Sequence, residues 1–487
     1  MMRSSSGMWV AATVVATLAA SLVAGGCAVG PDYKPPTPIA GAEVPLVSTS
    51  PTAETIAEPP DDWWHLYHDE TLDGLLKEAF AANTDLRVAA ANLTASRAVL
   101  SAVKSQRFPQ TQADVAATYG RDPVTEEILE LTGRDAQSLW IYEGVLEMAY
   151  EVDLLGRVRR SVEAARADTA ATIATRDVVK IAVAAETARA YAQVCALGEE
   201  LNVAHHSLDV VSREADITNN RRDAGAGTQF DVVRAQELVA QVRASIPPLE
   251  GQRRAVFFEL AAVLGRPPSK APTEVEGCVL PPRLSDLMPV GDGASLLKRR
   301  PDVRQAERRL AGATARIGIA TADLYPKIEL KGFIGGVSTE PDQFVTNKGI
   351  AWGVGPAISW TFPNQAGPRA RVRQAKAATV AALASFDAVV LQALKETEQA
   401  LALYRAELDH RQALSEAQNR AQKAFEIAHS QFIAGAVSDL DLLTTEQQLI
   451  STDAAVAASD AALVQDQIAV FKALGGGWRN REASAKR

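Results

Sequence analysis

Hydrophobic positions follow two different periods along this chain, and the change of period separates its elements. Residues 72–107 have helical spacing, and the pattern stops at Phe108 and Pro109, where proline ends a helix. A weaker alternation follows at 110–120, and from 139 to 154 the period becomes two. A period of two sustained over this length predicts a long strand with one apolar and one polar face.

The same order of patterns recurs in the second half of the chain. A helical pattern over 285–323 stops just before Pro326, and alternating segments follow at 327–337 and 351–362. The sequence therefore predicts two β-hairpins, one in each half.

The halves are copies of each other in sequence as well as in pattern. Ala224-Gly225-Ala226 matches Ala434-Gly435-Ala436, and Asp231 matches Asp441, at the same separation. We expect a first structural repeat over 71–280 and a second over 281–478. An extended segment (27–70) precedes them and a tail (479–487) follows.

Each hairpin is followed by helices of unusual length. The patterns predict long helices over 157–223 and 369–433, tip turns at 223–228 and 433–438, and returning helices over 228–264 and 438–474. At 1.5 Å per residue, a long helix spans roughly 100 Å. An ordinary coiled coil gives a similar pattern, but here two shorter helices match the length of one long helix. Pro247 and Pro248 predict an interruption and a kink in the first returning helix.

The four strands have no partner layer in the predicted elements. A globular sandwich also uses long strands, but the sequence offers no other strands to pack against them. Lipid would cover the apolar face, and a transmembrane barrel needs at least eight strands. Open strand edges are prohibitive in a bilayer. A barrel would therefore be shared between copies of the chain, with eight strands from a dimer, twelve from a trimer or sixteen from a tetramer.

The first 26 residues have the features of a secretory signal peptide. The uncharged run from Met8 to Val23 is too short to span a bilayer and ends at small residues. Cys27 follows directly, as in the lipobox of bacterial lipoproteins, although Ala24 stands where that motif usually has leucine. The alternative is an ordinary signal peptide with an incidental cysteine. Cys195 and Cys278 can pair only if the fold joins them, and Cys195 fits a buried small residue of a helix.

Composition removes several classes of function. The net charge of −9 argues against a nucleic-acid partner. His65 and His68 have a spacing that could bind metal, but neighbouring tryptophans favour packing or surface roles. Phosphate loops, nucleophile elbows and carboxylate pairs are not found in the sequence, so we predict neither an enzyme nor a metal or cofactor site.

Several motifs in order resemble the outer-membrane factors, the TolC-like channels, and in particular their NodT-type lipoprotein branch. These motifs are CAVGPDYKPP, DDWWHLYHDETLDGLL, LGRPP, LLKRRPDVRQAERRLAGATARIGIATADLYPKIELKGFIGG and ALGGGW. The resemblance implies an α+β membrane protein that forms a homotrimer. Its shared 12-stranded barrel in the outer membrane would continue as a periplasmic α-helical barrel.

The resemblance also implies a function and partners. The chain would be the passive, gated exit duct of a tripartite efflux system, supplied with small toxic or drug-like compounds by an inner-membrane transporter and a periplasmic adaptor. A type I protein-secretion duct is the nearer alternative. A lipid-anchored periplasmic coiled-coil adaptor is the alternative of another class.

Site residues follow from the same resemblance. Cys27 would carry the lipid anchor, with the proline-rich residues 31–60 as a tether. Asp441 would line the periplasmic aperture, where Thr444 replaces a second aspartate of many relatives. Asp231 is its counterpart in the first repeat, or else the N-cap of a helix or a solvated surface residue. The adaptor would contact the tips at Gly225, Ala226, Gly227, Thr228, Gly435, Ala436, Val437 and Ser438. The barrel lumen would present Glu143, Glu147, Glu151 and Asp153, either as a merely water-compatible face or as a source of cation preference.

Overall fold

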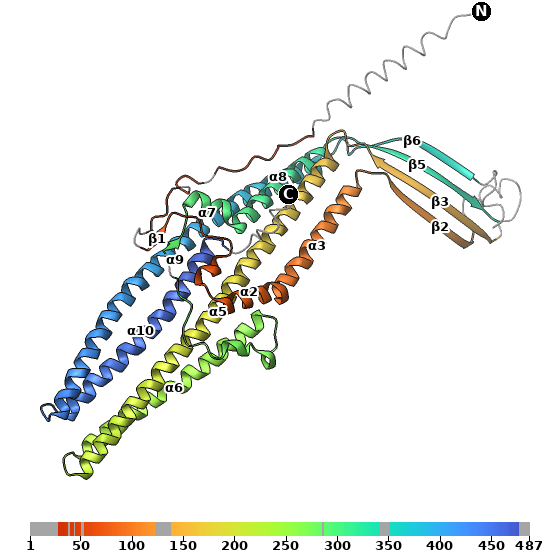
Figure 1. The fold of residues 1–487 in the computed structure, drawn as a ribbon. Coiled ribbons are helices and arrows are strands. Elements are labelled where there is room, and N and C mark those ends of the chain that lie inside the picture. The colour runs from red at the N-terminus through yellow and green to blue at the C-terminus, as the bar shows by residue number, and fades with distance from the viewer. Residues whose placement is uncertain are drawn as a thin grey trace, which may run out of the picture. The chain divides into compact units, whose positions relative to one another are not determined.

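The computed structural model describes residues 28–37, 39–42, 44–49, 53–121, 138–284, 287–340 and 350–476 (Figure 1). The predicted signal peptide, Cys27 and the tail 479–487 lie outside the described residues.

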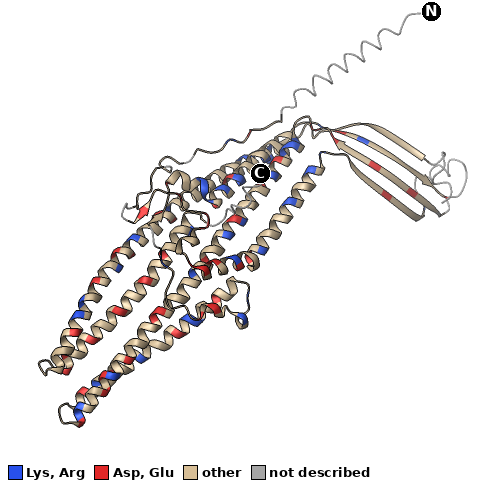
Figure 2. Ribbon diagram, in the orientation of Figure 1, with Lys and Arg blue, Asp and Glu red and all other residues tan. Residues whose placement is uncertain are grey.

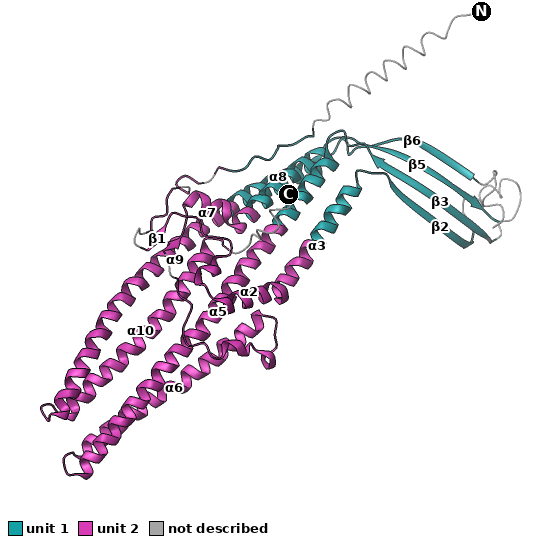
Figure 3. Cartoon of the chain, in the orientation of Figure 1, with its two compact units in different colours: residues 1–36, 94–171, 306–385 teal, residues 37–93, 172–305, 386–487 magenta. Residues whose placement is uncertain are grey.

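The chain divides into two compact units, each assembled from both sequence repeats (Figure 3). We call the unit of Met1–Pro36, Thr94–Ala171 and Ala306–Ser385 the sheet unit. The coil unit contains Thr37–Leu93, Thr172–Gln305 and Phe386–Arg487. The units therefore do not coincide with the two repeats, because each repeat contributes both strands and helical tips.

The sheet unit contains the four predicted strands. They are β2 (Gln110–Gly120), β3 (Leu139–Glu151), β5 (Lys327–Ser338) and β6 (Ile350–Ser359). They form one antiparallel sheet in the order β2-β3-β5-β6, so the two hairpins join through β3 and β5. The period of two is confirmed, but β3 ends three residues before the predicted boundary at 154.

The long and returning helices are also confirmed. They are α5 (Arg157–Asp223), α6 (Gln229–Val263), α9 (Ala366–Ile433) and α10 (Asp439–Ala473). The predicted interruption of α6 is wrong, because the helix continues through Pro247 and Pro248. Ile246 is buried just before the prolines, and Leu249 packs against the core just after them. Packing on both sides holds the helical backbone despite the lost hydrogen bonds.

The leading helix of the first repeat is divided in two, which the sequence pattern did not predict. α2 (Glu70–Ala82) and α3 (Thr84–Ser105) meet at Asn83, whose ψ of 134° is extended. The Asn83 side-chain oxygen accepts hydrogen bonds from the backbone N–H groups of Asp85 and Leu86, and its amide donates to the carbonyl of Val263. Asn83 therefore caps the second helix and fixes the break.

The second leading helix is divided at the matching place. α7 (Gly293–Arg299) and α8 (Pro301–Ala322) meet at Arg300, because the residue before proline is disfavoured in helical conformation. The helix begins at 293, after the cap residue Asp292, and not at 285 as predicted. Within the stretch expected to be helical, β4 (Met288–Pro289) pairs in parallel with β1 (Glu54–Thr55).

Aromatic residues organise the core of the coil unit. The short helix η1 (Trp63–Tyr67) places Trp63, which has no exposed surface, in a stack on Phe471 of α10 with ring centroids 4.8 Å apart. Two further short helices, η2 (Pro268–Lys270) and η3 (Thr273–Val275), follow α6. The tryptophans of the DDWW motif thus pack in the core.

The N-terminal segment is extended, but it is not a free tether. Within the sheet unit, the Val29 N–H donates to the carbonyl of Leu155, and Asp32 accepts a 2.7 Å bond from buried Arg160. The Tyr33 hydroxyl donates to Glu307 at 3.0 Å. The first described residues after Cys27 are therefore attached to α5 and α8.

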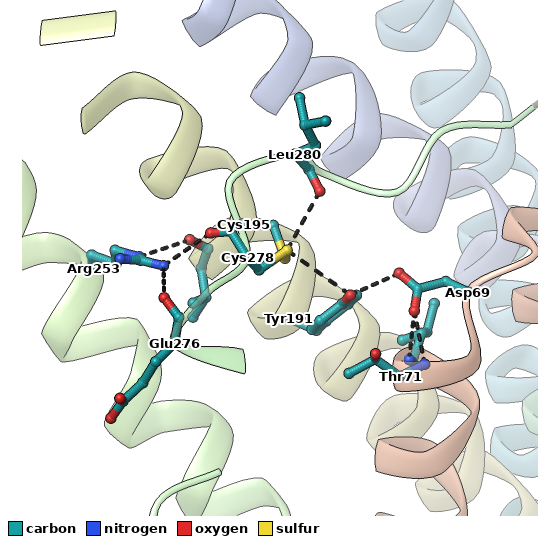
Figure 4. Close-up of a disulfide and its surroundings, with 10 residues drawn as sticks. Asp69, Thr71, Tyr191, Cys195, Arg253, Glu276, Cys278 and Leu280 are labelled. Atoms are coloured by element: carbon teal, nitrogen blue, oxygen red, sulfur yellow. Dashed lines mark hydrogen bonds between the residues drawn. A yellow bond between two sulfur atoms is a disulfide. The ribbon is translucent and has the colours of Figure 1, made fainter. Parts of the chain in front are cut away.

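The two cysteines within the described residues form a disulfide (Figure 4). Cys195 of α5 is bonded to Cys278, which follows η3, with 4.7 Å between their Cα atoms. Arg253 of α6 supports this segment by donating to the carbonyl oxygens of Glu276 and Cys278. The expectation that Cys195 is only a buried small residue is therefore incomplete: it is fully buried, and it is cross-linked.

Candidate functional site

The two helical tips have the same backbone construction. Gly225 and Gly435 adopt φ values of +78° and +72°, a region that favours glycine. After each long helix, a backbone N–H donates to a carbonyl of the last helical turn. Ala226 donates to the carbonyl of Arg221, and Ala436 donates to the carbonyl of Gln431, both at 2.8 Å. The pattern is that of a Schellman turn. The matching sequences of the two tips therefore adopt the same backbone conformation.

Each returning helix then begins with a capping box. The Ser438 hydroxyl accepts from the Asp441 N–H, while Oδ2 of Asp441 accepts from the Ser438 N–H at 3.1 Å and from its hydroxyl at 2.6 Å. Thr228 and Asp231 make the equivalent bonds in the first repeat. These bonds satisfy backbone donors at the start of a helix.

Two of the predicted aperture residues, Asp441 and Asp231, are thus parts of capping boxes at the surface. Hydrogen bonds from the hydroxyl and backbone of Ser438 lower the pKa of Asp441, and those from Thr228 lower the pKa of Asp231. Both carboxylates are therefore charged at neutral pH. Thr444 is exposed, and its hydroxyl donates to the carbonyl of Leu440. Asp231 is not itself the N-cap, because Thr228 has that position and Asp231 is the third helical residue of its capping box. A part of either aspartate in the aperture stays a prediction.

One face of the sheet is apolar across all four strands. The register places Leu146 beside Ile334, and Ile334 beside Trp352. The side chains on this face are substantially exposed: Val115, Tyr119, Trp140, Leu146, Leu330, Ile334, Trp352, Val354 and Ile358. Trp352, for example, is 73% exposed. Such a continuous apolar surface needs a cover that is not water.

The opposite face carries the polar strand residues. Glu143 and Glu147 lie on it at alternate positions of β3, and both are exposed. Gln112 is the neighbour of Glu147 on β2. Figure 2 shows that charges are sparse on the strands and frequent on the helices. The two carboxylates have the placement that a water-filled lumen requires, and their luminal role stays a prediction.

Glu151 and Asp153 are engaged at the end of the sheet. Glu151 forms a two-pronged ion pair with Arg157 and lies 3.4 Å from the Lys327 ammonium. Asp153 lies beyond β3, and its carboxylate accepts from the N–H groups of Val158 and Arg159. The prediction of Asp153 as a strand residue is wrong, because it caps the first turn of α5.

Two adjacent arginines of the motif RRPDVR have roles that the sequence did not reveal. Arg300 is 7% exposed, pairs with Asp302 and Glu396, and donates to the carbonyl of Ala473 at 2.8 Å. Arg299 donates to the carbonyls of Pro59 and Pro60. The pair therefore attaches the N-terminal segment, α9 and the end of α10 to one place. In the sequence, the one feature that indicates this junction is the cluster of charged residues beside Pro301.

His65 and His68, whose spacing could bind metal, do not converge on one place. His65 contacts Asp73 at 2.8 Å, whereas His68 has a positive φ of 52° and ends η1. Among the residues that the structure describes, His, Cys, Asp and Glu side chains nowhere form a group of three suited to a metal ion.

Comparison with known proteins agrees with this architecture. A profile of the family described as "Outer membrane efflux protein" matches residues 75–266 and 294–476. Nodulation protein T of Rhizobium leguminosarum bv. viciae is 27% identical over 477 residues, covering 96% of this chain and 94% of the relative. The probable outer membrane lipoprotein SilC of Salmonella typhimurium is 26% identical over 469 residues, covering 94% and 97%.

A solved structure gives the same result for the fold. The outer-membrane channel OprN superposes with a TM-score of 0.85 at 33% sequence identity, covering 93% of this chain and all of OprN. Helical tips joined to long helices, with a sheet whose apolar face is open, define the fold of an outer-membrane channel. The chain belongs to the outer membrane efflux protein family, and it is an efflux duct of the outer membrane.

Proposed function

We propose that three copies of this chain assemble into one continuous duct, with a twelve-stranded barrel in the outer membrane and an α-helical barrel in the periplasm. The observation that carries this proposal is the state of the sheet. In the described part of the chain, β2 and β6 each pair along one edge only. Open edges inside a bilayer leave backbone groups without partners, so neighbouring copies must supply the missing strands.

Exposed apolar side chains on α9 support the same assembly. One stretch of this helix is apolar enough to cross a membrane by length and composition, yet only 17% of it is buried. Val380, Leu383 and Leu391 are between 41% and 68% exposed. Helices of neighbouring copies would cover such side chains in a closed cylinder.

The duct itself would be passive and would act with two partners. An inner-membrane transporter would select small toxic or drug-like compounds, and a periplasmic adaptor would contact the exposed tips around Gly225 and Gly435. At the tips, Asp441 would contribute to a ring of three carboxylates that narrows the aperture. Glu143 and Glu147 would give the barrel a preference for cations.

Cys27 would attach the chain to the membrane through a lipid. The chain has three cysteines, and two of them form the Cys195–Cys278 disulfide. Cys27 is therefore the cysteine left for acylation. A disulfide also suits the oxidising periplasm.

The decisive experiment combines oligomeric state with conduction. Native mass spectrometry of the purified protein should give a trimer, and the same sample should insert channels into a planar bilayer. A monomer, or a trimer that never conducts, would contradict the proposal of a shared barrel. A reversal potential favouring anions in a salt gradient would remove the cation preference while leaving the duct.

A further inference from the structure

Three carboxylates, of which one is fully buried, lie close together near the tips of the coil unit. Glu446 of α10 is only 1% exposed, and neither of its carboxylate oxygens has a hydrogen-bond partner. Asp439 has one buried oxygen in the same condition. Buried carboxylates are ordinarily paired, because an isolated charge in a low-dielectric site is very costly.

The group brings together helices from both repeats. Glu446 interacts electrostatically with Glu214 of α5 and with Asp439 at the start of α10. The Thr218 hydroxyl of α5 donates to Asp439 at 3.3 Å, and Glu214 lies 3.7 Å from His429 of α9. The carboxylates therefore lie where the α5–α6 hairpin contacts the α9–α10 hairpin.

Apolar contacts surround this group and keep water away. Leu443 of α10 packs against Val211 of α5 and Leu238 of α6. Leu442 packs against Phe432 of α9. Glu446 follows these leucines by three and four positions, which places it on the same face of α10. An acidic side chain at a core position requires a reason other than packing.

The cations nearby do not neutralise the group. Arg213 pairs with Asp209 at 2.6 Å, and Arg221 stacks on the ring of Phe432. His429 lies 3.7 Å from Glu214 and acts on its charge. From α6, the acidic Asp231 acts on Asp439. Arg213 acts electrostatically on Glu214, and Arg221 acts electrostatically on Asp439.

We propose that Glu446 binds a proton when the two hairpins are packed together, and that loss of this proton loosens their contact near the tips. The group would be a pH-dependent latch between the repeats. The latch rests on the proposed duct only for its consequence, which is an aperture that opens more readily as the periplasm becomes less acidic.

The direction of the pH effect follows from the burial. Burial, followed by the charges of Glu214 and Asp439, raises the pKa of Glu446 to about 7, against an ordinary value of 4.5. The packed state thus holds a proton that a solvated Glu446 would release. Packing is strongest in acid, weakens as the pH rises above about 4.5, and has lost this contribution above about 7.

Hydrogen exchange of the full-length protein tests the latch without any conduction measurement. The amides of 209–223 and 425–440 would be followed in wild type and in Glu446→Gln at the same pH, so that intrinsic exchange rates cancel. The ratio of wild-type to variant exchange should be close to one at acidic pH and rise to at least ~10-fold at pH 8, because each pKa unit corresponds to a factor of about ten. A ratio that does not change with pH would overturn the proposal.

Two further variants make the result specific. Glu426→Gln changes an exposed carboxylate of α9 in the same way, and it should exchange like wild type at every pH. Glu214→Gln removes a charge next to Glu446, so the tip amides should exchange more slowly than in wild type at pH 8. This variant also tests the proposal if Glu446→Gln fails to fold. An effect of Glu426→Gln equal to that of Glu446→Gln would overturn the latch.

The same experiment separates a proton from a metal ion. If Ca²⁺ protects the wild-type tips at pH 8 as fully as Glu446→Gln does, the carboxylates bind a cation and the proton latch is wrong. A further outcome is that hydrogen exchange depends on pH through Glu446 while the single-channel conductance does not depend on pH. That result would support the latch and contradict its link to the aperture.

Discussion

Cys195 in the middle of α5 is covalently joined to Cys278 in the segment after α6, although 83 positions separate them in the chain. The disulfide closes a loop that contains the whole first tip, residues 223–228. It therefore ties the segment that leads into the second repeat to the longest helix of the first.

Removing this cross-link should destabilise the protein. A loop of this length predicts a loss of about 4 kcal/mol in the free energy of unfolding, because the unfolded chain regains conformational freedom. Cys195→Ala combined with Cys278→Ala should lower the temperature of thermal unfolding in detergent. An unchanged unfolding temperature would show that the bond constrains little beyond what packing already fixes.

The lipid anchor has a direct chemical test. Wild type should incorporate labelled palmitate in cells, and Cys27→Ser should not, since the other two cysteines are bonded to each other. Because the barrel provides its own membrane attachment, the variant should still reach the outer membrane. Label that persists in Cys27→Ser would exclude this cysteine as the acylated residue.

The aperture prediction needs a control for helix capping. Asp441→Ala removes both a charge and a capping box, whereas Ser438→Ala disrupts the box and keeps the charge. Both should destabilise the first turn of the helix, because each breaks the capping box. Only Asp441→Ala should increase single-channel conductance in a planar bilayer. Equal increases in both variants would assign the effect to a loosened tip, and no increase in either would remove Asp441 from the gate.

The two faces of the sheet should respond differently to the same charge. Val354→Lys places an ammonium on the exposed apolar face, where lipid would surround it, at a cost of ~2–4 kcal/mol near the bilayer centre. Ala351→Lys places it on the opposite face of the same strand. We expect Val354→Lys alone to reduce the yield of trimer on gels of unheated samples. A similar loss from Ala351→Lys would argue against a wet lumen.

The junction at Arg300 should be among the most sensitive points of the coil unit. Arg300→Met removes a buried cation from Asp302 and Glu396 and leaves the carbonyl of Ala473 without its donor. The change should cost about 1–3 kcal/mol, because both carboxylates remain partly exposed to water. Arg420→Met, which breaks an exposed pair with Glu416, should leave thermal unfolding unchanged. Equal behaviour of the two variants would show that burial does not strengthen the Arg300 pairs.

Local periodicity and chain duplication were enough to predict the strands, the long helices and the tips. Each depends on patterns of neighbouring residues, and the glycines at 225 and 435 mark turns by their own conformational freedom. Local patterns did not predict the break at Asn83. An asparagine within a helical pattern caps a helix here because its side-chain amide also donates a hydrogen bond to the distant carbonyl of Val263.

The sequence by itself thus determined the order and type of the elements, because period, proline and glycine act over a few residues. Tertiary structure alone decided which distant groups meet. It joined Cys195 to Cys278 and buried Glu446 near other carboxylates. Burial and pairing depend on segments far apart in the chain, and a single sequence carries no local signal for them.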